Sequence, residues 1–176
     1  MKIKLYKYGN KNNPPILFIH GFPFDHRMWK AQIEVLKKQF YCITYDILEK
    51  LETSNNKSPQ FFEFFVDDLF GILEKEKLNK PIVCGLSMGG YIILRAVERK
   101  LDLFSKIILC DTRTEADSNE AKLKRVEVFR KIEKFGIKKF LKEFTENTLS
   151  DFTKKTNLSI YKKALKISKD RTEYST

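Results

Sequence analysis

Residues 81–100 read PIVCGLSMGGYIILRAVERK, and this stretch decides the fold. The first seven residues are an apolar run rich in β-branched side chains, which predicts a buried strand over 81–87. The residues that follow, GGYIILRAVERK, have helical periodicity and predict a helix that begins directly after Ser87. The stretch therefore predicts a sharp strand-to-helix turn centred on Ser87.

The residues around that turn form a Gly-x-Ser-x-Gly sequence, the pattern of a nucleophile elbow. A serine in such a turn adopts a strained backbone conformation that lifts its hydroxyl above the sheet at a helix N-terminus. Gly85 and Gly89 relieve the crowding around it. We predict that Ser87 is a nucleophile. The alternative, a turn with no chemical role, explains the glycines but not their place between strand and helix.

A second motif, His20-Gly21-Phe22-Pro23, follows another apolar run, ILFIH at 16–20. A nucleophile that attacks an ester needs two N–H donors aimed at the developing oxyanion. The backbone N–H groups of Phe22 and Met88 are the predicted pair. His20 at a strand end suits a loop-shaping role better than that of a general base.

The rest of the first 113 residues predicts an α/β fold with a mostly parallel sheet flanked by helices. Continuous rather than alternating hydrophobicity is typical of parallel strands that are covered on both faces. Further strands are expected at 41–46 and 106–111, and an alternating edge strand at 2–9. Helices are expected over Phe24–Lys38 and after an N-cap at Ser58-Pro59, with a flexible loop over about 49–58.

From residue 114 the pattern changes to amphipathic helices without further strands. Apolar residues recur every third position at Leu123, Val126, Phe129, Ile132 and Phe135, and a second helix carries Phe140, Leu141 and Phe144. We therefore divide the chain into a core over 1–113 and a helical cap over 114–176. The apolar stripes of this cap must cover either the top of the sheet or a missing partner.

Composition excludes several classes of protein. The net charge is +11, but Lys alternates with Glu along the expected helices and does not interleave with aromatic residues, so we predict no nucleic-acid partner. No signal-like or membrane-spanning apolar run occurs, which predicts a cytoplasmic protein without a membrane partner. Cys42, Cys84 and Cys110 lack metal-ligand spacing, so we expect reduced core cysteines and neither a metal nor an organic cofactor.

The segments HGFPFDHRMW, GLSMGG and LCDTR, in this order and spacing, resemble the α/β-hydrolase superfamily, among its small esterases and enol-lactonases. The resemblance covers essentially the whole chain. It implies Ser87 as nucleophile, Phe22 and Met88 as oxyanion donors, and a cap that shapes an acyl pocket. Asp25, His26 and Trp29 then belong to the loop and helix behind the oxyanion strand, with Trp29 a core aromatic.

The resemblance fails at the general base. In this family the order is Ser, then acid, then His, but both histidines of this chain, His20 and His26, precede Ser87. Asp111 matches a position that some members use for the acid, although a structural role at a turn suits it better. Glu49 and Leu51 stand where the family has glycines. We therefore expect a fold without its last strands and a chain that is nearly inert alone.

Two functions remain open. The favoured one is a carboxylic-ester or lactone hydrolase, a serine hydrolase by family, whose chain is shortened and whose substrate carries a small apolar acyl or aryl group. The alternative is a non-catalytic pseudoenzyme or binding module on the same scaffold. Because an incomplete sheet has an open edge, we also expect a complementing C-terminal chain or self-association.

Overall fold

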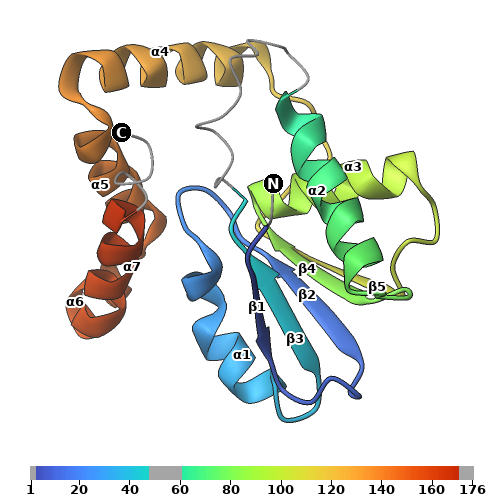
Figure 1. Cartoon of the computed structure of the whole chain (residues 1–176). Coiled ribbons are helices and arrows are strands. Elements are labelled where there is room, and N and C mark those ends of the chain that lie inside the picture. The colour runs from blue at the N-terminus through green and yellow to red at the C-terminus, as the bar shows by residue number, and fades with distance from the viewer. Residues whose placement is uncertain (1–2, 48–60, 171–176) are drawn as a thin grey trace. The chain divides into compact units, whose positions relative to one another are not determined.

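A computed structural model describes residues 3–47 and 61–170. The chain divides into two compact units, Met1–Thr114 and Glu115–Thr176 (Figure 1). All the strands of the described residues belong to the first unit, and the second is helical. No helix in the described part is both long and apolar enough to cross a bilayer.

The first unit contains a five-stranded, mostly parallel sheet with the order β1-β3-β2-β4-β5. Its strands are β1 (Leu5–Tyr8), β2 (Pro15–Ile19), β3 (Tyr41–Tyr45), β4 (Ile82–Leu86) and β5 (Lys106–Cys110). Strand β1 pairs antiparallel with β3, and the other pairs are parallel. The sequence prediction of an α/β fold with an alternating edge strand at the N-terminus is confirmed.

Helices cover both faces of this sheet because successive side chains of a strand point to opposite faces. Leu17 and Ile43 face a core shared with α2 (Phe61–Lys75) and α3 (Met88–Arg99). Phe18 and Cys42 face a second core on the opposite side, which contains Trp29 and Ile33. The two layers of helices can be followed in Figure 1. Their continuous burial accounts for the continuous hydrophobicity of the strands.

The segment expected as one helix over Phe24–Lys38 is shorter and broken. It consists of the 3-10 helix η1 (His26–Trp29) followed by α1 (Lys30–Leu36). The side chain of Asp25 accepts a hydrogen bond from the Arg27 N–H, which starts the helix two residues later than expected. Trp29 is a core aromatic, 4% exposed, as predicted. The expected Ser58-Pro59 cap, the loop at 49–58, and Glu49 and Leu51 lie outside the described residues.

Strand β5 is unlike the other parallel strands. Within residues 3–47 and 61–170 it pairs only with β4. Ile107, Ile108 and Leu109 are 42%, 44% and 43% exposed, although their sequence is that of a buried strand. Because consecutive residues point to opposite faces, both faces of β5 are incompletely covered. The structure therefore contains the open apolar edge that the sequence analysis expected.

The second unit contains only helices among its described residues. They are α4 (Asn119–Phe135), α5 (Ile137–Thr148), α6 (Asp151–Thr156) and α7 (Leu158–Asp170). Leu141 of α5 and Ile167 of α7 are buried. The apolar stripe of α4 is not: Leu123 and Phe129 are each 66% exposed. The helical prediction is confirmed, whereas the role of this unit as a cap stays a prediction.

Candidate active site

Ser87 occupies the turn between β4 and α3. Its φ of 48° and ψ of −110° place it in a sparsely populated backbone region, which costs a non-glycine residue about 1–3 kcal/mol. The Ser87 carbonyl accepts hydrogen bonds from the N–H groups of Gly90 (2.9 Å) and Tyr91 (3.2 Å). These are the first bonds of α3, so the turn and the start of the helix stabilise each other. Strain of this kind is characteristic of functional sites.

The glycines beside Ser87 allow three segments to meet at the turn. A Cβ on Gly89 would lie 2.3 Å from the carbonyl oxygen of Ile19, at the end of β2. A Cβ on Gly85 would lie 2.6 Å from the Gly89 carbonyl oxygen. Both distances are too short for a real side chain. The two glycines are therefore required by close packing between β2, β4 and α3.

The predicted oxyanion segment lies directly against Ser87. A Cβ on Gly21 would be 3.3 Å from the Ser87 Cβ and 3.0 Å from the Leu86 carbonyl oxygen. Phe22 follows Gly21 and is 37% exposed. Met88 is the first residue of α3 and packs against the core. The structure thus places Gly21 against Ser87, with Phe22 and Met88 as their next residues in the chain, while the role of Phe22 and Met88 as oxyanion donors stays a prediction.

The end of β5 fastens the backbone of Ser87 from the other side. The Ser87 N–H donates to the Cys110 carbonyl (2.9 Å), and the Thr112 hydroxyl donates to the Ser87 carbonyl (3.0 Å). Asp111 lies between these two residues, exposed and at a φ of 42°. Its carboxylate has no histidine to orient, because both histidines of the chain bond elsewhere. Sequence reasoning did not identify Thr112, whose hydroxyl makes this contact.

His20 is fully buried, and both of its ring nitrogens have partners. The Nε2 atom accepts the Ile47 N–H at 3.0 Å. Nδ1 must therefore carry the proton, and it lies 3.2 Å from the Gly21 carbonyl, to which it donates. No ring nitrogen remains to accept a proton from Ser87. The structure thus favours the predicted loop-shaping role over the general-base alternative.

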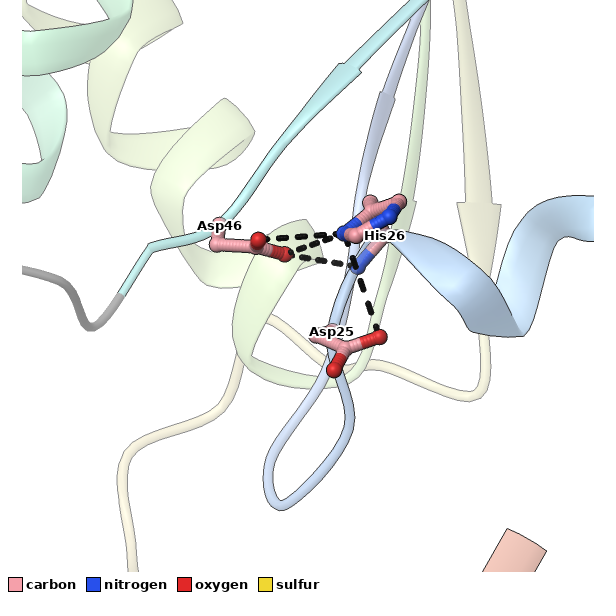
Figure 2. Close-up of side chains that lie close together, drawn as sticks. All are labelled: Asp25, His26 and Asp46. Atoms are coloured by element: carbon pink, nitrogen blue, oxygen red, sulfur yellow. Dashed lines mark hydrogen bonds and ion pairs between the residues drawn. The ribbon is translucent and has the colours of Figure 1, made fainter. Parts of the chain in front are cut away.

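The second histidine forms a cluster with two carboxylates, shown in Figure 2. His26 Nδ1 lies 3.0 Å from each carboxylate oxygen of Asp46, which follows β3. The His26 backbone N–H also donates to Asp46, at 2.8 Å. Burial opposes ionisation of Asp46, but these hydrogen bonds outweigh it and lower its pKa to about 2. Asp46 is thus a stable anion at neutral pH.

Asp25, His26 and Asp46 could supply three metal-ligand atoms, since these atoms lie within 4.8 Å of one another. The hydrogen bonds fit a different arrangement. The Arg27 guanidinium already binds the Asp25 carboxylate, since Arg27 Nη2 donates to Asp25 Oδ2 at 2.7 Å. His26 Nδ1 carries the proton that it donates to Asp46 and so offers no lone pair. The donor set is therefore that of a satisfied hydrogen-bond cluster and does not fit a metal ion.

Sequence reasoning placed His26 behind the oxyanion strand but did not identify its bond to Asp46. A signal was present. Asp46 directly follows strand β3, and His26 comes after the neighbouring parallel strand β2. Both residues therefore lie at the carboxyl edge of the sheet. The carboxyl ends of parallel strands are where polar groups of an α/β sheet converge.

Taken together, these contacts surround a strained Ser87 with closely packed glycines, and no described residue is placed to act as its base. The Ser87 hydroxyl makes no hydrogen bond to another residue in the described part of the chain. Activation of a serine requires a ring nitrogen or another base within hydrogen-bond reach. The geometry is therefore that of a strained serine turn with Gly21 packed against it, and the roles of nucleophile and oxyanion donor stay predictions.

Comparisons with known proteins agree with this geometry. The 3-oxoadipate enol-lactonase 1 of Acinetobacter baylyi is 31% identical over 86 residues, which are 49% of this chain and 32% of the lactonase. A thermophilic esterase from Thermogutta terrifontis superposes with a TM-score of 0.80 at 31% identity, over 94% of this chain and 60% of the esterase. An enol-lactonase from Burkholderia xenovorans LB400 shares the fold, with a TM-score of 0.75 at 21% identity, over 98% of this chain.

The chain thus spans about a third of the length of that curated relative, and 60% of the length of the solved esterase. A family model for the alpha/beta hydrolase fold matches residues 14–170, which include strands β2 to β5 and the turn at Ser87. This chain therefore belongs to the α/β-hydrolase family.

Proposed function

We propose that this chain provides the nucleophile and the oxyanion donors of a carboxylic-ester or lactone hydrolase. The observation that carries the proposal is Ser87 at a φ of 48° between β4 and α3, with Gly21 packed against it. The Ser87 Oγ attacks the substrate carbonyl, and the N–H groups of Phe22 and Met88 stabilise the oxyanion. A general base takes the Ser87 proton and passes it to the leaving oxygen, which departs as an alcohol from an ester and stays attached to the acyl group of a lactone. Water then hydrolyses the resulting acyl-enzyme.

The general base of this reaction comes from outside the described residues. His20 has both ring nitrogens engaged, and His26 is bound to Asp46. Family order places the acid and the histidine after the nucleophile. Loss of triad members lowers the rate by about 10⁴-fold or more. We therefore expect the 176-residue chain alone to react slowly at Ser87.

The same proposal includes a polypeptide that pairs with β5. On the side away from β4, the backbone groups of β5 pair with no described strand, and the side chains of Ile107, Ile108 and Leu109 are exposed. Both faces of β5 are exposed. A partner that adds a parallel strand to this edge, together with helices on each side of the sheet, would cover both faces. Without that cover, this edge promotes association between copies of the chain.

Substrate class follows from the surroundings of Ser87. The exposed Phe22 ring, 37% exposed, and the neighbouring Met88 side chain suit a small apolar acyl or aryl group. The similar esterase and enol-lactonases act, by their names, on esters and lactones. The proposed chemistry uses no metal or organic cofactor, because Ser87 itself is the nucleophile and backbone N–H groups stabilise the oxyanion.

The competing function is a binding module without catalysis. One observation favours it, namely that no described residue hydrogen-bonds to the Ser87 hydroxyl. In that case the strained turn would be a remnant of an ancestral enzyme. The surface around Gly21 and Ser87 would then bind an ester-like ligand without cleaving it.

Reaction with a fluorophosphonate probe separates the two functions. The purified chain, Ser87→Ala and a control variant, Ser105→Ala, are incubated with the probe and weighed by intact mass spectrometry. The hydrolase predicts slow labelling that goes to one probe per chain, that Ser87→Ala abolishes and that Ser105→Ala retains. A folded chain that stays unlabelled over days would support the binding module instead.

A further inference from the structure

The loop that follows β2, residues 20–26, is called the oxyanion loop below, because it contains Gly21 and Phe22. The described contacts attach both of its ends to the residues that follow β3, Asp46 and Ile47. We propose that His20 and His26 are positioning residues, which hold the oxyanion loop in place beside Ser87. This inference rests on the proposed function, since it concerns the donors of that same site.

The first attachment is at His20. Its imidazole is fully buried, and Nε2 accepts the Ile47 N–H at 3.0 Å. The opposite nitrogen, Nδ1, donates across the ring to the Gly21 carbonyl at 3.2 Å. One ring thus connects the chain after β3 to the peptide group between Gly21 and Phe22. That peptide group contains the N–H that the proposed mechanism uses, so the ring fixes its orientation.

The second attachment is at His26. The Asp46 carboxylate receives both the backbone N–H of His26 and its Nδ1–H. The Tyr6 ring stacks on the imidazole, with 3.5 Å between centroids and 10° between planes. The Tyr6 hydroxyl donates to the same carboxylate at 3.3 Å. His26 is therefore held against Tyr6 of β1 as well as against Asp46 at the end of β3.

Between the two attachments the loop closes on itself. The Phe24 N–H donates to the Gly21 carbonyl at 2.9 Å, the same oxygen that His20 contacts. Asp25, beyond the turn, is bound by the backbone and guanidinium of Arg27. A short loop that is tied at both ends and bridged in the middle has little freedom to move its peptide groups. Preorganised donors of this kind stabilise an oxyanion without reorganising during the reaction.

The position of β3 makes this attachment effective. Strand β3 pairs with β2 on one side and β1 on the other, and all five of its residues are buried. Asp46 and Ile47 are also buried, at 8% and 3% exposed. The loop is therefore fastened to the end of a strand that is buried and paired on both sides. Nothing in this arrangement requires β5 or the helical unit, so the oxyanion loop is held in the 176-residue chain as it stands.

Two variants of His26 separate hydrogen bonding from ring packing. His26→Phe keeps a ring on Tyr6 but removes the Nδ1 donor, whereas His26→Asn keeps an N–H donor near that position and removes the ring. We measure amide hydrogen exchange of Phe22 and Phe24 by NMR in the whole chain, together with the free energy of unfolding. A charge-assisted hydrogen bond predicts that His26→Phe speeds exchange at these amides about ten-fold or more, and that His26→Asn restores most of the protection.

The fluorophosphonate labelling rate provides a readout that a purely structural role would not change. The folded His26→Phe chain is expected to label Ser87 more slowly than the folded wild type, with His26→Asn close to the wild type. If the wild-type chain does not label, the proposed function fails, but the exchange rates still judge the attachment. Equal exchange at Phe22 and Phe24 in all three chains would overturn the role of His26.

The ring of His20 is tested by its tautomer. Nitrogen chemical shifts of the imidazole in the folded chain are expected to show a protonated Nδ1 and an unprotonated Nε2. Such a ring accepts from Ile47 and has no nitrogen for a substrate proton. A protonated Nε2 in the folded chain would break the bond to Ile47 and overturn the role assigned to His20.

Discussion

Strands β2 and β5 lie on opposite sides of β4 and differ in how completely they are packed. Four of the five residues of β2 are buried, and the loop after it is fastened by two histidines. Strand β5 exposes four of its five residues, yet it holds the Ser87 backbone through Cys110 and Thr112. The difference teaches that Ser87 lies between a well-packed part of the sheet, at β2, and an incompletely covered part, at β5. The buried contacts that hold the loop beside Ser87 lie on the β2 side, whereas the β5 side is incompletely covered.

The largest expected effect tests the packed side. Gly89→Ala would place a methyl group 2.3 Å from the Ile19 carbonyl oxygen, and neither backbone can withdraw without moving β2 or α3. We expect a loss of stability on the order of 3–5 kcal/mol, measured by urea unfolding. Gly71→Ala in α2 is the matched control, because no atom lies within 4 Å of the new methyl group. That change should stabilise the chain by about 0.5–1 kcal/mol, since alanine favours a helix. Similar effects of the two variants would refute the close packing at the turn.

The open side predicts an effect on association. The wild-type chain should self-associate with rising concentration in sedimentation experiments, because β5 offers an unpaired apolar edge. Ile108→Lys places a charge in the middle of that edge and should weaken association by about ten-fold, equivalent to about 1.4 kcal/mol. Leu101→Lys, at a residue that is 77% exposed outside the strands, is the control and should leave association unchanged. A wild-type chain that stays monomeric at high concentration would remove β5 as the source of association.

A third effect, similar in size, concerns Asp46, the carboxylate that ties the loop after β2 to the end of β3. The pKa of Asp46 is lowered to about 2, so its folded-state anion stabilises the chain above the unfolded pKa of about 4. The contribution is lost as pH falls through about 2. Asp46→Asn should therefore cost about 1–2 kcal/mol at pH 7, and this difference should shrink between pH 4 and pH 2. Unfolding at several pH values measures it. A constant difference would mean that the charge of Asp46 is not what stabilises the loop.

Much of the fold was predictable from the sequence, for reasons that particular residues make clear. Ile16 to Ile19 and Tyr41 to Tyr45 are apolar at every position or nearly so, which is typical of strands buried on both faces. The glycines at 85 and 89 mark the turn because only glycine tolerates such close backbone contacts. These signals are local, so a single sequence contains them.

The contacts that the sequence did not predict are between distant segments. The bond from His26 to Asp46 spans 20 residues, and that from Thr112 to Ser87 spans 25. Each depends on the register of neighbouring strands, which periodicity alone does not determine. The start of the helical segment at His26 was also missed, because Asp25 can cap a helix only when its own backbone is extended.

Two hydrogen bonds, one to the Cys110 carbonyl and one from the Thr112 hydroxyl, couple the end of β5 to the backbone of Ser87. By linkage, any polypeptide whose binding to β5 changes the geometry of Ser87 must bind with a different affinity once Ser87 is acylated. The covalent state of one serine would then set the lifetime of a complex formed at the edge of the sheet. An acylated chain and a free chain would behave as two distinct binding partners encoded by one sequence.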